Sequence, residues 1–493
     1  MYPVPRPRCW TYILFLVAVA TTPTTAYTWP NPKLDELESL LYDRQGHNAR
    51  YPAAGLSPTC TTFSPSPDDA SYPVNVGDWN TNIDDALKRT IKLATFSNRY
   101  VSLSDSIALS TVTALEMCGD LAIPFRGGRV DAKRTKIPGG FGKYATALTH
   151  HAFTPEETVQ LATCLHDFGY LQHQRSLASR HQEPSNDGPG QTVLMKDGLQ
   201  EPLKDNIQAP HFFLDAANPR NACAELFTRM IDTVPKGVNL SETIEPLPVK
   251  PVGLQLTWLG HGNMRLSGKI RLWDMKPNPE REVELHWKAR DGSMSPTFSA
   301  LLSHNPDHIS RSLIPNSPPY TSLWYDIRLA PIDADSSISQ LWLEIDEGDG
   351  STKRIEDQNG LGFSVQDAIM LTNSTCLDLS GEDTVLVLEV AIRADLKPKQ
   401  VYIQFDSLDI TGSPTLESFR LPTPARRIVD SGYVLWNAAF KHSDLPWTVA
   451  VDVGSRTYET VYLGEGSRSL NRTLPVCLFD EKAQFAILSA QAY

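Results

Sequence analysis

The second half of the 493-residue chain is filled with short segments in which apolar and polar residues alternate. These segments alternate with period two or are rich in β-branched and aromatic residues, and turn residues separate them: "LQLTWL", "MRLSGKIRLW", "VELHWKARDG", "SLWYDIRLA", "QLWLEID", "TVLVLEVAI" and "QVYIQFDSLDI". Successive side chains of a strand point to opposite faces, so the pattern is typical of strands with one buried face. We therefore expect residues 246–493 to form an all-β domain, most simply an antiparallel sandwich.

The tryptophans of this second half have two interpretations. Most are expected to pack in the core or between strands, and the alternative is a carbohydrate-binding face built from some of them. The residues concerned are Trp258, Trp273, Trp287, Trp324, Trp342, Trp436 and Trp447.

A proline-rich segment marks the boundary between two differently patterned halves. "EPLPVKPVG" (245–253) carries three prolines, which favours a stiff, extended connector. Before it, residues 27–245 show helical signals, including a capping box formed by Ser102 and Asp105 and the segment "CAELFTRMIDTV". We predict a multidomain chain, mainly α-helical over 27–245 and all-β over 246–493.

The segment 1–26 has the features of a secretory signal peptide. Arg6 and Arg8 precede an apolar run over 12–20, and small residues follow at 24–26. We therefore expect a secreted, extracellular protein with no membrane span, because no later segment is long and apolar enough to cross a bilayer. The formal net charge of −12 argues against nucleic acid or an anionic membrane as a partner.

The cysteines and glycosylation sequons fit an oxidising compartment. Six cysteines remain after the signal peptide, which suggests three disulfides from about fifteen connectivities. Pairing neighbours in chain order gives Cys60–Cys118, Cys164–Cys223 and Cys376–Cys477. Asparagine-linked glycans are expected at Asn239, Asn373 and Asn471.

One predicted helix, "FTPEETVQLATCLHDFGYLQHQ" (153–174), carries a histidine among short side chains. Thr154 and Glu157 form a capping box that fixes where the helix begins. His166 then lies on a side of the helix that small residues keep open, where a planar group such as haem could approach. The alternative interpretation is a half-buried histidine that is bonded to a backbone carbonyl.

Three segments resemble the plant/fungal haem peroxidase superfamily, in the secreted ascomycete type with a β-rich C-terminal domain. The helix over 153–174 resembles the family's proximal helix, through residues that include Phe153, Cys164 and His166. "VSLSDSIALSTVTALEMCGDLAIPFRGGRVDA" (101–132) and "CAELFTRMIDTVPKGVNLSETIEPLPVKPVGLQLT" (223–257) resemble two further stretches of that family, in the family's order.

The resemblance implies a haem b cofactor with His166 as the axial ligand of its iron. It further implies a scaffold salt bridge at Asp131, an alternative calcium contact at Asp167 and a hydrogen-bonding partner for the ligand at Asp187. The implied activity is oxidation of small phenolic or aromatic donors with hydrogen peroxide, in a response to oxidative stress.

The distal half of such an active site is missing from the chain. The family motif R-x-x-F-H-D, which supplies the distal histidine and arginine, does not occur, and no histidine lies between Cys60 and Asp105. The domain over 27–245 is therefore expected to be truncated on its distal side, with no catalytic residue identified. The alternative function is a catalytically inactive secreted protein, haem-free or haem-binding only, that acts through wall or glycan contacts of its β-domain.

Overall fold

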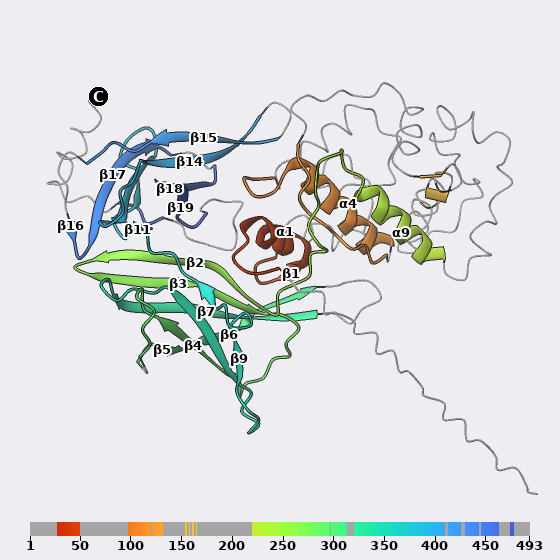
Figure 1. Ribbon diagram of the computed structural model, residues 1–493, viewed down its shortest axis with the longest axis horizontal. Helices are drawn as coiled ribbons and strands as arrows, with labels where there is room; N and C mark the ends of the chain where they lie inside the picture. Colours follow the sequence, from red (N-terminus) through yellow and green to blue (C-terminus); the bar gives the residue numbers. More distant parts are fainter. Residues whose placement is uncertain are drawn as a thin grey trace, which may run out of the picture.

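A computed structural model describes the chain over residues 27–49, 97–119, 121–131, 219–295, 297–312, 320–409, 413–424, 429–442, 445–462 and 474–477, together with residues 153, 154, 157, 160, 161 and 164. Within these residues lie three helices and 19 strands (Figure 1). No helix among them combines the length and the apolar composition needed to cross a lipid bilayer.

The helices are α1 (Pro32–Tyr42), α4 (Leu103–Gly119) and α9 (Pro219–Ile231). The strands of the first part are β1 (Gln45–Gly46), β2 (Val249–Gly260), β3 (Asn263–Leu272), β4 (Glu282–Lys288), β5 (Ser299–Leu301), β6 (Ser303–Ser312), β7 (Tyr320–Asp333), β8 (Gln340–Asp346), β9 (Arg354–Glu356) and β10 (Phe363–Ser364). Those of the second part are β11 (Ile369–Thr372), β12 (Cys376–Asp378), β13 (Val385–Arg393), β14 (Gln400–Leu408), β15 (Pro414–Arg420), β16 (Val429–Asp430), β17 (Tyr433–Lys441), β18 (Trp447–Val453) and β19 (Arg456–Glu459).

One ten-stranded sheet runs through both parts of the β region. Its strand order is β1-β6-β7-β3-β2-β11-β13-β17-β16, with β12 paired to β13. The two parts join where β11 pairs in parallel with β2, which places Leu371 beside Thr257. A five-stranded sheet (β10-β8-β4-β5, with β9 on β8) and a four-stranded sheet (β15-β14-β18-β19) complete the architecture.

The two smaller sheets cover opposite faces of the ten-stranded sheet. Trp258 of β2 and Met370 of β11 belong to the core shared with the five-stranded sheet. Leu371 points the other way, into the core shared with the four-stranded sheet. Because neighbouring residues of a strand face opposite sides, the β region consists of two sandwiches that share a sheet but bury different faces of it (Figure 1).

The helices pack together around a separate apolar core. Leu37, Leu40 and Leu41 of α1 contact this core, to which α4 contributes Leu109 and Leu115. The residue before α1 is an asparagine that accepts a hydrogen bond from the Leu34 amide, and proline occupies the first turn. Both residue types favour helix starts. These residues explain where α1 begins, and its three buried leucines give it an apolar side that faces the other helices.

The opposite side of α1 lies on the ten-stranded sheet. Glu38 of α1 forms ion pairs with Lys250 of β2 and Arg271 of β3, and all three side chains are buried. Burial alone would raise the pKa of Glu38, but Arg271 and Lys250 outweigh that effect and hold the pKa below its usual value. Glu38 is therefore a carboxylate that belongs to both the helical region and the sheet.

A second ion pair joins the helical region to the four-stranded sheet. Arg99 contacts Asp406 of β14 at 2.7 Å, and the two side chains are only 4% and 7% exposed. Tyr462 donates a hydrogen bond to the same carboxylate at 2.8 Å. α1 thus contacts the ten-stranded sheet, and the turn that precedes α4 contacts the four-stranded sheet.

The predicted fold class is wrong, because the described chain is β-rich and forms no mainly α-helical peroxidase-like domain. Helical periodicity predicted local helices, and α4 and α9 do form, but local helices do not determine how a domain is built. The proline-rich segment 245–253 was predicted to be an extended connector, but its second half is part of a strand. β2 begins at Val249 and pairs with β3. Pro251 fits there because, among the described strands, only β3 pairs with this part of β2.

Candidate functional site

Most of the residues implied by the peroxidase resemblance lie outside the described residues: the axial ligand His166, the calcium contact Asp167 and Asp187, the expected hydrogen-bonding partner of the ligand. The predicted disulfide residue Cys60 and the sequon residue Asn471 lie outside them too. Cys118 lies in α4, and its side chain is not described. Asn239 and Asn373 are both exposed, so the two sequon asparagines in the described chain reach solvent.

Two disulfides have the pairing expected from chain order. Cys164 is bonded to Cys223 across 59 residues, and Cys376 to Cys477 across 101 residues. The first connects the predicted helix at 153–174 to α9, and the second ties the end of the described chain to β12.

The scaffold residue Asp131 acts through hydrogen bonds to a helix start. Its carboxylate accepts hydrogen bonds from the backbone amides of Leu103 and Ser104, at 2.9 and 2.8 Å. Amides in the first turn have no partner within their own helix, so Asp131 caps α4. The ion pairs of this segment are formed by Arg129 instead, which lies 3.1 Å from Asp105 and 3.4 Å from Asp232, and by Arg126, which also pairs with Asp232.

The predicted capping box at residues 154–157 is present in both directions. The Thr154 amide donates to the Glu157 carboxylate at 2.8 Å, and the Glu157 amide donates to the Thr154 hydroxyl at 3.1 Å. The start of this helix is therefore confirmed, although the position of His166 farther along lies outside the described residues.

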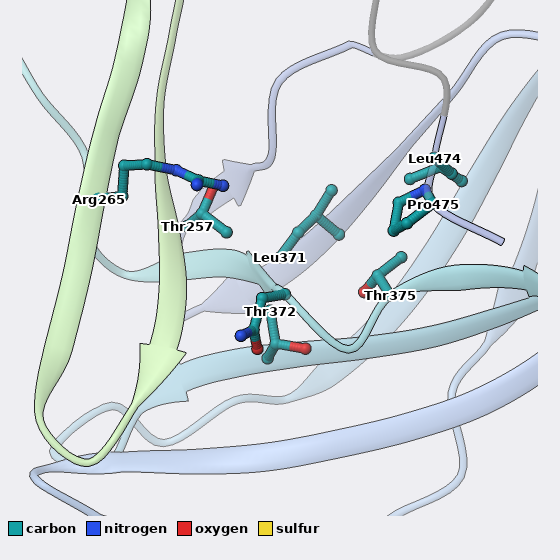
Figure 2. Close-up of a pocket in the computed structure, with 8 residues that line it drawn as sticks. Thr257, Arg265, Leu371, Thr372, Thr375, Leu474 and Pro475 are labelled. Carbon is teal, nitrogen blue, oxygen red and sulfur yellow. The ribbon is translucent and has the colours of Figure 1, made fainter. Parts of the chain in front are cut away.

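A small pocket lies where the two β-sandwiches meet (Figure 2). Its volume is about 150 Å³, which is below the range of about 300–1,000 Å³ that small-molecule sites occupy. The lining residues are mostly apolar or hydroxylated: Thr257, Arg265, Leu371, Thr372, Asn373, Thr375, Leu474 and Pro475. Its size makes it a poor candidate for a substrate site.

The outer face of the five-stranded sheet offers a broader surface. Side chains of β4 and β8 alternate between the buried core and this outer side, as their burial patterns show. We call this surface the β4–β8 face. It is defined by the outward residues of the two strands: Glu282, Glu284, His286, Lys288, Gln340, Trp342, Glu344 and Asp346.

An aromatic pair lies on the β4–β8 face. His286 and Trp342 are directly opposite each other on adjacent strands, and their rings stack with centroids 5.5 Å apart and planes 14° apart. Both side chains are half-buried. Two largely exposed apolar side chains border the face, Leu301 of β5 at 63% and Ile355 of β9 at 59%.

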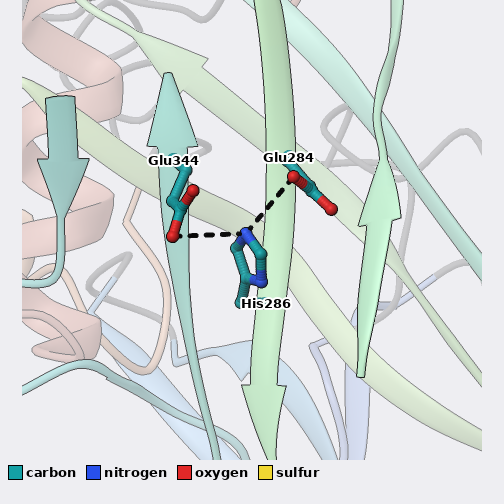
Figure 3. A group of neighbouring side chains, drawn as sticks. All are labelled: Glu284, His286 and Glu344. Carbon is teal, nitrogen blue, oxygen red and sulfur yellow. Dashed lines mark ion pairs between the residues drawn. The ribbon is translucent and has the colours of Figure 1, made fainter. Parts of the chain in front are cut away.

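Two acidic pairs lie beside the aromatic pair on the same face, both on the side toward the start of β4. Glu284 lies directly opposite Glu344, and Glu282 lies directly opposite Asp346. Like charges opposite each other on neighbouring strands destabilise a sheet, so two such pairs in succession call for a functional reason. Glu284, His286 and Glu344 also lie close enough together to hold a metal ion (Figure 3). Within the described residues, no other group of three histidine, cysteine, aspartate or glutamate side chains does so.

Sequence reasoning singled out Trp342 only as one of seven tryptophans and missed Glu284, His286 and Glu344. "VELHWK" and "QLWLEID" do alternate, which predicts that these residues share a face within each strand. The register that brings the two strands together joins positions that are far apart in the sequence, and alternation within a strand carries no information on that register.

Comparisons with known proteins give a distant relative. No protein-family model matches the chain. A WSC domain-containing protein of Arthroderma benhamiae (strain ATCC MYA-4681 / CBS 112371) is 26% identical over 338 residues, which is 54% of this chain and 46% of the relative. The chain therefore spans about half the length of the curated relative that it matches.

Solved structures give only slight overlaps. A pullulanase from Anoxybacillus sp. LM18-11 complexed with maltotriose is 9% identical, with a TM-score of 0.12, over 42% of this chain and 25% of that one. A type I pullulanase from Bacillus subtilis str. 168 complexed with maltose is 8% identical, also with a TM-score of 0.12, over 42% and 24% of the two chains. Overlaps of this size carry no argument about architecture or function.

The peroxidase prediction is wrong. The curated relative is a WSC domain-containing protein, and the described chain is β-rich, so membership of the haem peroxidase superfamily and peroxidase activity lose their support. Hydrogen peroxide and small aromatic donors are unsupported as partners for the same reason. The resemblance rested on short motifs in three segments, and short motifs of this kind do not determine a fold.

Proposed function

We propose that this chain is a non-catalytic extracellular protein that binds polysaccharide through the β4–β8 face. The observation that carries the proposal is the stacked pair of His286 and Trp342 on an outer sheet face, with Glu284 and Glu344 beside it. A sugar ring has an apolar C–H face and a hydroxylated edge. It therefore needs a flat ring to lie on and acceptor oxygens nearby.

Charge narrows the class of polysaccharide. Four carboxylates, Glu282, Glu284, Glu344 and Asp346, occupy the face in two opposed pairs, and the whole chain has a formal net charge of −12. An anionic polymer would be repelled by this surface. We therefore infer that the preferred partner is a neutral polysaccharide.

Sedimentation with insoluble neutral polysaccharides tests the proposal. Purified full-length chain is incubated with particulate β-glucan or chitin, and the bound fraction is measured against protein concentration. Trp342→Ala is expected to weaken binding at least tenfold, which corresponds to about 1.4 kcal/mol. A soluble sulfated polysaccharide is expected not to compete.

Phe419→Ala is the matched control, because Phe419 is an aromatic side chain 47% exposed on β15, in the other sandwich. It should bind like the wild type. Absence of binding to every neutral polysaccharide, or equal binding by Trp342→Ala and the wild type, would contradict the proposed function.

A further inference from the structure

Three side chains on the β4–β8 face bring their polar atoms together around one point. Glu284 and His286 lie on β4 with one residue between them, and Glu344 of β8 lies opposite Glu284. His286 Nε2 is 3.5 Å from Glu284 Oε2 and 3.7 Å from Glu344 Oε1. All three ligand atoms lie within 4.8 Å of one another, with the imidazole nitrogen aimed between the two carboxylates (Figure 3).

Hydrogen bonds between His286 and the two glutamates do not account for this arrangement. Both separations from Nε2 are longer than an N–H···O hydrogen bond, whose donor and acceptor atoms lie roughly 2.7–3.2 Å apart. Nε2 is buried, and within the described residues it has no hydrogen-bond partner. A buried ring nitrogen without a partner is unfavourable, as are the two glutamates that face each other across the strands.

The spacing suits a shared ion. Zinc binds imidazole nitrogen and carboxylate oxygen at about 2.0–2.2 Å, and in a tetrahedral site this places neighbouring ligand atoms about 3.3–3.6 Å apart. The two separations from Nε2, 3.5 and 3.7 Å, lie at or just beyond that range, so a small movement of either glutamate would complete the site. The stacked Trp342 ring helps to hold the imidazole in place.

We propose that Glu284, His286 and Glu344 bind one zinc ion. The ion satisfies the buried nitrogen, separates the opposed carboxylates and links β4 to β8. Three protein ligands leave a fourth position for water, as in zinc sites that exchange a ligand. A sugar hydroxyl could take that position, and this use of the ion rests on the proposed function.

Isothermal titration of the metal-stripped full-length chain with zinc chloride tests the site without any polysaccharide. We expect one equivalent to bind and to raise the thermal unfolding midpoint. His286→Gln and the double variant Glu284→Gln/Glu344→Gln should each weaken the affinity at least tenfold and lose the rise in midpoint. The midpoints of the metal-free variants verify that they are folded.

Glu282→Gln is the control, because Glu282 lies on the same strand and face and has an acidic partner opposite but no histidine. It should bind zinc like the wild type. No zinc binding by the wild type, or unchanged binding by His286→Gln, overturns the site. A negative polysaccharide result with normal zinc binding would count against the proposed function alone.

Discussion

Glu38 of α1 and Arg271 of β3 form an ion pair in which both side chains are completely buried. Lys250 of β2 contacts the same carboxylate, and the Arg271 guanidinium also lies 3.5 Å from Asp43 and over the Trp273 ring. Charges are costly to bury unless they are paired and hydrogen-bonded. The cluster therefore fixes α1 in one position on the sheet.

Replacing Glu38 by glutamine should destabilise the protein strongly. The change leaves Arg271 and Lys250 buried without the carboxylate that both of them contact, and breaking such a buried pair costs about 3–5 kcal/mol. Chemical denaturation at pH 7 measures the loss. The control is Glu417→Gln on the exposed strand β15, and an exposed substitution of this kind should change stability by less than about 0.5 kcal/mol. A similar effect of both variants would contradict the account of the cluster.

A histidine contact predicts how stability depends on pH. His47 stacks on His308 with ring centroids 3.8 Å apart, and its Nε2 lies 2.7 Å from Lys269 Nζ. Burial, together with Lys269 and His308, lowers the pKa of His47 from 6.5 to about 4. Between these values the unfolded chain binds a proton that the folded chain does not. The contribution of His47 is therefore complete above about pH 6.5 and lost as the pH falls through about 4.

The variant His47→Gln isolates that contribution, because glutamine does not titrate and can still accept a hydrogen bond from Lys269. Its free energy of unfolding should change less than that of the wild type between pH 6.5 and 4. His261→Gln, in the exposed turn between β2 and β3, serves as the control and should keep the wild-type slope. An unchanged slope in His47→Gln would show that another group titrates.

Removing the disulfide Cys376–Cys477 should lower stability. The bond closes a loop with a sequence separation of 101, and removing a native disulfide typically costs about 2–5 kcal/mol. Thermal unfolding of Cys376→Ser/Cys477→Ser should show a clearly lower midpoint than the wild type. Under reducing conditions the wild type should move toward the variant; equal midpoints with and without the bond would rule out a stabilising role.

If the chain is secreted as proposed, glycans are expected at the accessible sequons. Asn373 is exposed in the turn between β11 and β12, and Thr375 completes its sequon. Mass spectrometry of protein from a secreting eukaryotic host should detect a glycan there that an endoglycosidase removes. Asn373→Gln should lack it, while Asn239 keeps its own. An unmodified Asn373 in secreted protein would contradict this expectation.

Local features were predictable from the sequence to a useful degree. Thr154 and Glu157 form the expected capping box, and "QLWLEID" is β8 with the expected alternation of burial. These features depend on residues a few positions apart, where backbone geometry sets which side chains meet. Chain order also gave the partner of Cys376 correctly.

Apart from the disulfide pairing, long-range features were not predictable. Nothing in "PKLDELESLLY" marks Glu38 as buried, because its cations come from β2 and β3, far along the chain. The opposed pair Glu284 and Glu344 likewise depends on strand register. The haem peroxidase interpretation failed because it extended a few helix-like motifs to a whole domain.

Hydroxyl-radical footprinting of the chain with and without bound neutral polysaccharide tests the central claim most directly. The account predicts that oxidation of Trp342 falls sharply on binding, while oxidation of Phe419 on the opposite sandwich stays unchanged. Protection of Phe419 with no change at Trp342 would place binding elsewhere and contradict the assignment of the β4–β8 face.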